Sequence, residues 1–169
     1  GQTLDSVIYF LNSDATYKKM FKAAFNNSNI TSKLMLKALA QFTGSLITSN
    51  SKYVRVVNGK DTFSTFEKKG YQLYKENCSS CHKEPLFTDN SYRNNGMHLN
   101  RFKDIGRQKI TGVSTDSLKF KVPSLRNIQL TFPYMHDGSI YSVPQVIDHY
   151  ISKINIQQPG LDTALQTAI

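Results

Sequence analysis

The sequence lacks several features that mark large classes of protein. Its 169 residues contain no Trp and only two Cys, and no apolar run reaches the length that crosses a membrane. We find no signal peptide, internal repeat or low-complexity segment. The length fits a single domain with its own hydrophobic core. The sequence therefore predicts a globular chain rather than a membrane-spanning or repeat protein.

Acidic residues are also scarce. The chain has 12 Asp and Glu against 21 Lys and Arg, which gives a formal net charge of +9. Such a balance raises nucleic acid or an anionic membrane as partners. The basic residues are scattered along the chain, however, and no nucleic-acid-binding motif is present. This pattern favours a solvated basic surface, and a positive face could steer an acidic partner protein.

Both cysteines belong to one short motif, Cys78-Ser79-Ser80-Cys81-His82. C-x-x-C-H is the attachment signature of a c-type haem. Two thiols three positions apart can each form a thioether to one vinyl group of the same porphyrin. The next residue, His82, then brings an imidazole to the iron as the proximal ligand.

Three other uses of the pair remain open at this point. A structural zinc site would use Cys78, Cys81 and His82 but needs a fourth ligand, and no second Cys pair exists. A redox C-x-x-C would lie in a βαβ pattern, whereas here the pair follows a helical segment. A plain disulfide would leave His82 without a role. Haem attachment is the hypothesis that uses all three residues.

Hydrophobic periodicity and capping residues predict a mostly helical chain. Helices are expected over residues 3–12, 14–25, 31–48, 64–77, 142–154 and, as a short last helix, within 160–169. Tyr53–Val57 is predicted to be a short strand or an extended segment. Ser64 and Glu67 form a capping box at the helix that leads into Cys78. Residues 83–127 have little periodicity and many turn residues, as expected of long loops that wrap a haem.

Several longer motifs allow a comparison with a known family. They are Tyr17–Phe25, Pro85–Asp89 directly after the C-x-x-C-H motif, Asp104–Arg107, Thr111-Gly112, Phe120–Asn127 and Pro133–Gly138. Their content and order resemble the C-terminal half of a bacterial dihaem cytochrome c peroxidase or of its MauG-type relatives. The resemblance runs through nearly the full length of the chain.

The resemblance implies an all-α, class I cytochrome c-like fold with long haem-wrapping loops, forming one domain over residues 1–169. It implies one covalent haem c in this chain and a second haem domain N-terminal to it. In the family that other domain holds the peroxide-reacting haem and a Trp between the haems. The present sequence has one C-x-x-C-H motif and no Trp. We therefore expect a truncated or processed piece that does not carry out peroxidase chemistry by itself.

The function that follows from the resemblance is electron relay to the peroxide-reducing haem of the missing domain. Its implied partners are that N-terminal domain, a small redox protein as electron donor and, for the parent enzyme, hydrogen peroxide. Haem attachment takes place outside the bacterial cytoplasm, so a periplasmic protein with an upstream signal peptide is expected. The alternative is a stand-alone monohaem cytochrome c that only carries electrons.

The ligand opposite His82 decides the redox chemistry. A thioether favours Fe(II), whereas an anionic phenolate favours Fe(III) or higher. In the family the distal residue lies one helix after the H-D-G motif, and the same distance from His136 reaches Tyr150, as in the MauG type. Met135 is the alternative ligand. Tyr150 could also be a buried aromatic without a role at the iron.

The remaining site predictions concern residues around the haem. His136 and Asp137 are candidates for orienting the distal side or linking the two haem domains, or they simply form a turn. The resemblance places a Ca²⁺ at the domain interface, with the carbonyls of Thr131 and Pro133 as weak candidate ligands. The candidates for binding the haem propionates are Arg107, Arg126 and Lys103.

Overall fold

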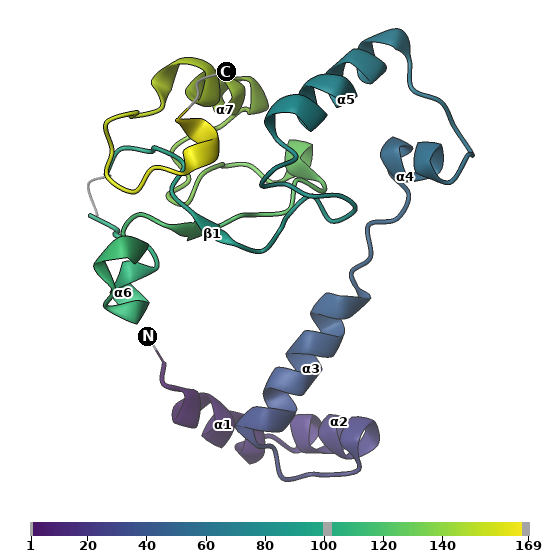
Figure 1. The fold of residues 1–169 in the computed structure, drawn as a ribbon. Helices are drawn as coiled ribbons and strands as arrows, with labels where there is room; N and C mark the ends of the chain where they lie inside the picture. The colour runs from purple at the N-terminus through teal and green to yellow at the C-terminus, as the bar shows by residue number, and fades with distance from the viewer. Residues whose placement is uncertain (1, 100–102, 167–169) are drawn as a thin grey trace. The chain divides into compact units, whose positions relative to one another are not determined.

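The computed structural model describes residues 2–99 and 103–166, and it divides into two compact units. Unit 1 comprises residues 1–49 and unit 2 comprises residues 50–169 (Figure 1). The sequence predicted one domain over 1–169, so this division differs from the prediction. The physical reason is the segment 46–50, which forms no helix or strand and separates two sets of locally packed elements.

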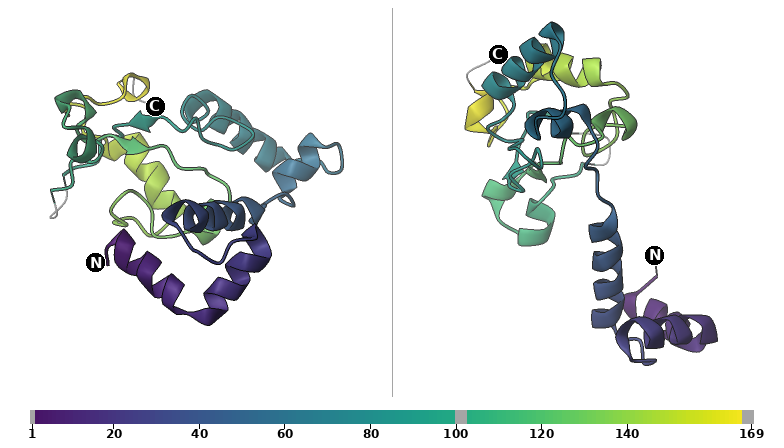
Figure 2. Two further views of the ribbon diagram at one scale, coloured as in Figure 1. Left: turned by 90° about the horizontal axis from the view of Figure 1, so that it is seen from below. Right: turned by 90° about the vertical axis from the view of Figure 1, so that its right-hand side faces the viewer.

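Unit 1 is a group of three helices, each begun by a side-chain cap. They are α1 (Leu4–Ser13), α2 (Ala15–Phe25) and α3 (Ser32–Ser45). Thr3, Asp14 and Thr31 accept backbone N–H bonds at the three N-termini. Helices α1 and α2 meet at an angle, which Figure 2 shows most clearly. The predicted helices are therefore present, although α3 ends three residues earlier than expected.

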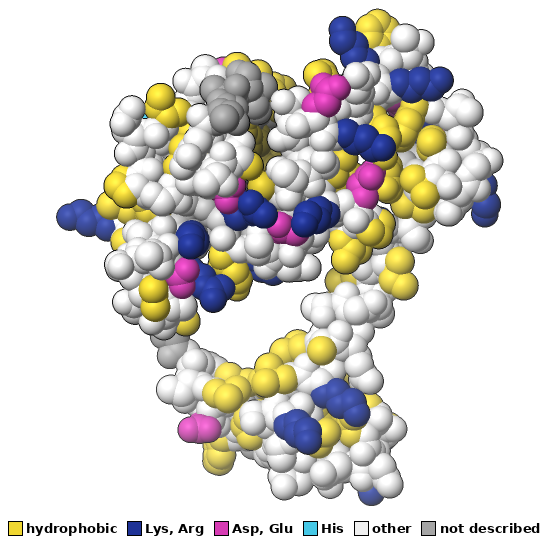
Figure 3. Space-filling view, in the orientation of Figure 1, with side chains coloured by type: hydrophobic (Ala, Val, Ile, Leu, Met, Phe, Trp, Pro, Cys, Tyr) yellow, Lys and Arg dark blue, Asp and Glu magenta, His cyan; other side chains and the backbone are white. Residues whose placement is uncertain are grey.

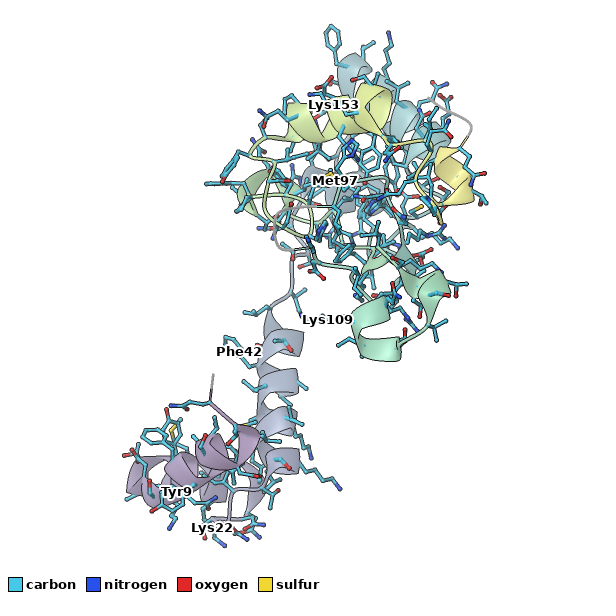
Figure 4. The ribbon with its side chains drawn as sticks, turned by 90° about the vertical axis from the view of Figure 1, so that its left-hand side faces the viewer. Tyr9, Lys22, Phe42, Met97, Lys109 and Lys153 are labelled. Carbon is cyan, nitrogen blue, oxygen red and sulfur yellow. The ribbon has the colours of Figure 1, made fainter. Side chains whose placement is uncertain are left out.

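The interior of unit 1 is small. Phe21 and Ile30 are its buried apolar residues among those described. The Asn12 amide pairs with the backbone of Ile30, donating to its carbonyl at 2.7 Å and accepting from its N–H at 3.0 Å. By contrast, Leu39 and Phe42 of α3 are 53% and 63% exposed. Phe42 projects from its helix in Figure 4, and hydrophobic side chains gather on the surface of this unit in Figure 3.

Unit 2 carries the remaining helices. They are α4 (Lys52–Val57), α5 (Thr65–Asn77), α6 (Gln108–Thr111), α7 (Val143–Asp148), the π-helix η3 (His149–Lys153) and the short 3₁₀ turns η1 (Ser114–Asp116), η2 (Ile128–Leu130) and η4 (Thr163–Leu165). The helix predicted over 142–154 is thus continuous through α7 and η3. Of the helix predicted within 160–169, η4 forms, and residues 167–169 lie outside the described residues.

The prediction for Tyr53–Val57 was wrong, because this run forms helix α4. Its β-branched and aromatic residues favour a strand on propensity alone. Two local features override that preference. The Ser51 hydroxyl caps the helix by accepting from the Val54 N–H, and the Arg55 guanidinium binds both Asp61 and the Asn50 carbonyl.

A two-stranded antiparallel sheet is the feature that the all-α prediction omitted. Strand β1 (Tyr92–Arg93) pairs with β2 (Phe120–Lys121), with Tyr92 opposite Lys121 and Arg93 opposite Phe120. The sheet is short, and about half of the described residues are helical. Within the described part of the chain, none of the helices has the length and hydropathy that crossing a bilayer requires.

The centre of unit 2 forms where residues 94–96 meet the C-terminal segment. Asn94 is 1% exposed, and its carbonyl accepts from the Asp162 N–H at 3.0 Å. The Gly96 carbonyl accepts from the Asn155 N–H at 3.1 Å. Gly96 has φ +72°, and a Cβ there would lie 2.5 Å from Ile154 Cγ2. Only glycine meets both the conformational and the steric requirement at this position.

We therefore expect Gly96→Ala to lower the free energy of unfolding by about 3 kcal/mol, from the left-handed backbone and the steric overlap. Gly70→Ala is the matched control, because Gly70 lies in α5 and a Cβ added there would meet no atom within 4 Å. That change should raise stability by about 0.5–1 kcal/mol. Equilibrium denaturation of both variants measures the difference in their free energies of unfolding. Equal effects of the two substitutions would contradict the special requirement for glycine at position 96.

Candidate haem site

Helix α5 delivers the C-x-x-C-H motif. At its N-terminus Ser64 and Glu67 form the predicted capping box, and Lys52 binds the Glu67 carboxylate at 2.6 Å. At its C-terminus the backbone continues to turn, with Cys78 N–H donating to Tyr74 at 2.8 Å and His82 N–H donating to Cys78 at 3.0 Å. The two thiols and the imidazole are therefore held by a hydrogen-bonded continuation of the helix.

The His82 imidazole is oriented by two backbone carbonyls. Its Nδ1 lies 3.2 Å from the Phe87 oxygen and 3.0 Å from the Pro123 oxygen. Carbonyl oxygens only accept hydrogen bonds, so Nδ1 must carry the proton. That tautomer leaves the Nε2 lone pair for a metal, which is the arrangement of metal-binding histidines held by a backbone carbonyl.

The loops that supply these carbonyls are joined to each other by hydrogen bonds. We call Pro85–Asp89 the haem loop. Ser124 Oγ donates to the Leu86 carbonyl at 2.6 Å, and Thr88 Oγ1 donates to the Val122 carbonyl at 2.6 Å. Arg126, a propionate candidate, donates through Nη2 to the Pro85 carbonyl at 2.7 Å. The haem loop and the Phe120–Asn127 motif thus form one bonded unit beside His82.

Both cysteines are free thiols. Desolvation around the sulfur raises the pKa of Cys78, and the neighbouring Cys81 adds to the effect. The motif also lies at the C-terminal end of α5, where the helix dipole disfavours a thiolate. Redox-active C-x-x-C pairs need the opposite, a lowered thiol pKa. The redox alternative therefore has no support in this geometry.

The zinc alternative is also unsupported. Among the residues that the structure describes, no group of three or more His, Cys, Asp or Glu side chains is arranged to hold a metal ion. Two adjacent free thiols and an imidazole with an available Nε2 instead match the donor set of a covalently attached haem. The residues present therefore fit haem c.

Tyr150 and Met135, the two candidates for the sixth iron ligand, meet at one residue. Asn95 Nδ2 lies 3.5 Å from Met135 Sδ, and the Asn95 side chain also hydrogen bonds to Tyr150. Burial raises the pKa of Tyr150, the bond from Asn95 lowers it, and the nearby thiols of Cys81 and Cys78 raise it. Tyr150 therefore lies in the same region of unit 2 as the two thiols.

The backbone at Tyr150 is unusual. It lies in the π-helix η3, which continues α7 without a break. Single π-turns inside α-helices occur frequently at functional sites. The preceding residue, His149, is 4% exposed, contacts the Tyr150 ring edge to face at 5.2 Å, and bonds through Nε2 to the Asn95 carbonyl at 3.1 Å. Asn95 therefore contacts both residues at the start of the π-turn.

The H-D-G loop forms a packed turn. The His136 ring stacks on Phe120 with ring centroids 3.8 Å apart. Asp137 Oδ1 accepts from the Ser139 N–H at 3.1 Å, and Gly138 takes a positive φ of +67°. These contacts match the turn interpretation of His136 and Asp137.

The other predicted site residues are paired with side chains outside the motif or are exposed. Arg107 Nε binds Asp116 at 3.0 Å, and its guanidinium lies over the Tyr92 ring at 4.3 Å. Lys103, Thr131 and Pro133 are exposed. Tyr150 thus lies near the thiols of Cys81 and Cys78, and Met135 is linked to Tyr150 through Asn95, whereas Arg107 is paired with Asp116.

Arg93 is a site residue that sequence reasoning missed. Its guanidinium binds Asp89 at 2.8 Å and Asp162 at 3.0 Å, and its Nε donates to Ser91 at 2.8 Å. This network ties the haem loop to the C-terminal segment. Burial raises the pKa of Asp89, but hydrogen bonds from Ser91 and Arg93 hold it below its usual range. A long-range bond between residues 93 and 162 leaves no signal in local periodicity.

Asn95 was missed for a different reason. In the sequence, Asn94-Asn95-Gly96 is typical of a turn, and turn chemistry explains the triplet without any further role. Only the contacts of its side chain and carbonyl, which reach residues 40 and 54 positions away, show its place between the ligand candidates.

Unit 2 also has an open pocket of about 740 Å³ on its surface. It is lined by Met97 and His98, by residues 139–141 and Gln145, and by His149 and residues 152–156. Figure 4 marks Met97 and Lys153, which both line it. The lining does not include the thiols, His82 or Tyr150. On the face of unit 2 seen in Figure 3, basic side chains lie beside acidic ones rather than forming a continuous basic patch.

Comparison with known proteins identifies the family. The sequence profile described as "Di-haem cytochrome c peroxidase" matches residues 1–62. Cytochrome c551 peroxidase of Nitrosomonas europaea is 35% identical over 137 residues, covering 78% of this chain and 41% of that protein. MauG of Methylophilus methylotrophus is 34% identical over 170 residues, covering 96% of this chain and 50% of that protein.

A solved structure agrees with these relatives. A MauG-like protein associated with microbial copper homeostasis has a TM-score of 0.74 and 30% identity, covering 87% of this chain and 48% of that chain. The chain belongs to the family of dihaem cytochrome c peroxidases and MauG-type proteins. It spans about half the length of the curated relatives that it matches.

The Arg93 network predicts a pH dependence. Because the folded-state pKa of Asp89 lies below its unfolded value, its contribution is present above about pH 4 and is lost as the pH falls further. Asp89→Asn should lower the free energy of unfolding at neutral pH by about 2–3 kcal/mol and flatten the acid limb of the stability profile. Denaturant titrations between about pH 3 and about pH 7 measure both effects.

The control is Asp5→Asn, which changes an exposed carboxylate in α1 of unit 1. It should leave the unfolding of unit 2 unchanged. An Asp89→Asn variant that keeps the full acid dependence of the parent protein would show that Arg93 does not stabilise the haem loop in this way.

Proposed function

We propose that unit 2 is a c-type haem domain of a dihaem cytochrome c peroxidase or MauG-like oxidoreductase, and that it transfers electrons to a second haem domain. The observation that carries the proposal is the orientation of His82, whose Nδ1 is bonded to two carbonyls and leaves Nε2 for a metal, in a motif with two free thiols. The chain is then an electron-relay part of a peroxide-reducing enzyme.

The chain's own residues have distinct tasks in this proposal. Cys78 and Cys81 would hold the haem through thioethers, and His82 would bind its iron. The Phe87 and Pro123 carbonyls keep the imidazole in one orientation and increase its basicity. When bound, the haem supplies one-electron redox chemistry.

Tyr150 is the proposed distal ligand. To bind as a phenolate it must lose its proton, which burial opposes. The hydrogen bond from Asn95 favours the ionised form and so offsets part of that cost. Met135, on the other side of Asn95, is the alternative ligand. Tyrosine ligation supports the MauG type, and methionine ligation supports the peroxidase type.

A second haem domain completes the proposed enzyme. The relatives are about twice as long as the matched region, which supports a dihaem protein over a stand-alone monohaem carrier. We assign the haem domain to residues 50–169, because every residue of the candidate site belongs to unit 2. The sequence analysis instead expected one domain over residues 1–169.

The remaining parts of the proposal follow from the family. The protein is exported to the periplasm, accepts electrons from a small redox protein and, as the complete enzyme, reduces hydrogen peroxide. Ca²⁺ binds at the interface with the other haem domain through the carbonyls of Thr131 and Pro133. Two exposed carbonyls alone supply too few of the about six to eight oxygen ligands that Ca²⁺ takes, so other residues must complete that site.

The haem assignment predicts the result of cysteine substitution. The protein, coexpressed with haem-attachment proteins, should show a c-type spectrum, and its denatured pyridine adduct should report two thioethers. Cys78→Ala and Cys81→Ala should each remove one thioether, and the double variant should lose covalent haem. Iron-free protein that binds stoichiometric zinc would instead establish the zinc alternative.

The distal ligand is tested by Tyr150→Phe. Removing the phenol oxygen should change the oxidised absorption and electron paramagnetic resonance spectra and raise the reduction potential, because a phenolate stabilises Fe(III). Tyr141→Phe is the matched control, since Tyr141 is 68% exposed and lies nine residues earlier. If Tyr150→Phe leaves the spectra unchanged while Met135→Ala alters them, Met135 is the ligand.

A further inference from the structure

Three tyrosines form a cluster directly behind the haem motif. Tyr53 comes from α4, and Tyr71 and Tyr74 come from α5. The Tyr71 and Tyr74 rings stack with centroids 6.0 Å apart and planes 13° apart, and Tyr53 lies 6.2 Å from Tyr71. We call Tyr53, Tyr71 and Tyr74 the tyrosine cluster. Its three rings form a continuous aromatic contact.

One carboxylate serves two of these phenols. Tyr71 Oη donates to Glu84 Oε1 at 2.7 Å, and the Tyr53 hydroxyl is also hydrogen bonded to Glu84. Burial and then the bond to Glu84 raise the pKa of both tyrosines to about 12. The Tyr71 phenol therefore has a carboxylate within hydrogen-bond distance that can accept its proton.

The third tyrosine connects the cluster to the haem motif. The Tyr74 hydroxyl donates to the backbone carbonyl of His82, and the Tyr74 carbonyl accepts from the Cys78 N–H at 2.8 Å. Phe87 contacts both the tyrosine cluster and His82. Its ring contacts Tyr53 at 4.7 Å and Tyr74 at 5.4 Å, while its carbonyl orients the His82 imidazole. The cluster thus contacts His82 directly through Tyr74 and indirectly through Phe87.

We propose that the tyrosine cluster is a redox site that donates one electron to the haem held by Cys78, Cys81 and His82, after hydrogen peroxide has oxidised the protein's haems above the ferric state. This inference rests on the proposed function. The cluster would protect the haem, or supply an electron when no donor protein is bound.

The step balances with groups that are present. One tyrosine loses an electron to the oxidised haem, and its phenolic O–H bond breaks. The proton passes to the Glu84 carboxylate, where a new O–H bond forms, so a neutral tyrosyl radical and a protonated carboxyl result. Peroxide is the oxidant that supplied the oxidising equivalent. Transfer of the proton to a bonded base avoids forming a phenol cation in a partly buried site.

Electron movement along the cluster is favoured by short steps. The centroids of Tyr53 and Tyr71 are 6.2 Å apart and those of Tyr71 and Tyr74 are 6.0 Å apart, and Tyr74 is hydrogen bonded to the backbone of His82. Simple packing of α4 against α5 would account for the ring contacts. It would not require a carboxylate shared by two partly buried phenols, and that feature separates the two explanations.

The test uses the haem-loaded protein expressed from its complete gene. The oxidised protein is mixed with hydrogen peroxide, frozen within milliseconds to seconds and examined by electron paramagnetic resonance. Parent protein should give a tyrosyl radical, identified by narrowing of the signal when ring-deuterated tyrosine is incorporated. Peptide mass spectrometry should find oxidised or cross-linked products at Tyr53, Tyr71 or Tyr74.

Two variants separate a redox role from a packing role. Tyr71→Phe keeps the ring and removes the phenol, and Glu84→Gln keeps a hydrogen-bond acceptor but removes the base. Each should lower the radical yield at least several-fold while the haem spectrum and helix content stay unchanged. Tyr141→Phe is the control and should leave the yield as in the parent protein.

The outcomes are distinguishable. If peroxide oxidises the attached haem but produces no radical in the cluster, the inference is overturned and the proposed function stands. If haem is attached but peroxide does not change its spectrum, the peroxide-reducing part of the proposed function is overturned together with the inference. A radical of undiminished yield in both Tyr71→Phe and Glu84→Gln also overturns it. Failure to attach haem to Cys78 and Cys81 overturns the proposed function, and the inference then loses its basis.

Discussion

The hydrogen bonds from His82 Nδ1 to the Phe87 and Pro123 carbonyls are the interaction on which the site depends. They come from two loops separated by about 35 residues of the chain, so both loops must fold before the imidazole is fixed. Hydrogen bonds from Ser124 to Leu86 and from Thr88 to Val122 join the two loops, so the folding of each loop depends on the other. The hydrogen bonds of the His82 Nδ1 proton therefore link the haem loop, the small sheet and the end of α5.

The region around Tyr150 and Met135 is also organised by one polar residue, which contacts several partners. Asn95 bonds to Tyr150, Met135 and His149, and the neighbouring Asn94 and Gly96 anchor the same segment to the C-terminal chain. Loops carry these contacts because loop backbone is not committed to helix or sheet hydrogen bonds. The long unperiodic region is thus the part of unit 2 that builds the site, whereas α5 and α7 with η3 present residues to it.

Sequence patterns predicted α5, its capping box and the C-x-x-C-H motif because all three are local. The caps Asp14, Thr31 and Ser142 were equally visible, and each begins the expected helix. The family was also predicted from motifs and is shown by the relatives. Helix α4 was missed because capping and the Arg55–Asp61 pair outweigh β-propensity. The division into two units, the Arg93 network and the role of Asn95 depend on contacts across tens of residues, which periodicity does not encode.

Because of the π-turn in η3, the number of residues in the helix determines which residue faces Asn95. A π-turn accommodates one residue more than the α-helix would, and each residue in an α-helix turns the chain by about 100°. Deleting one residue between Ser142 and His149 would let α7 run on as a regular helix and present a different side chain toward Asn95. Which side chain lies beside Asn95 therefore depends on the number of residues in α7 and η3 as much as on the amino acid at position 150. Insertion or deletion of one residue in this helix would therefore change the side chain beside Asn95 without any substitution at position 150.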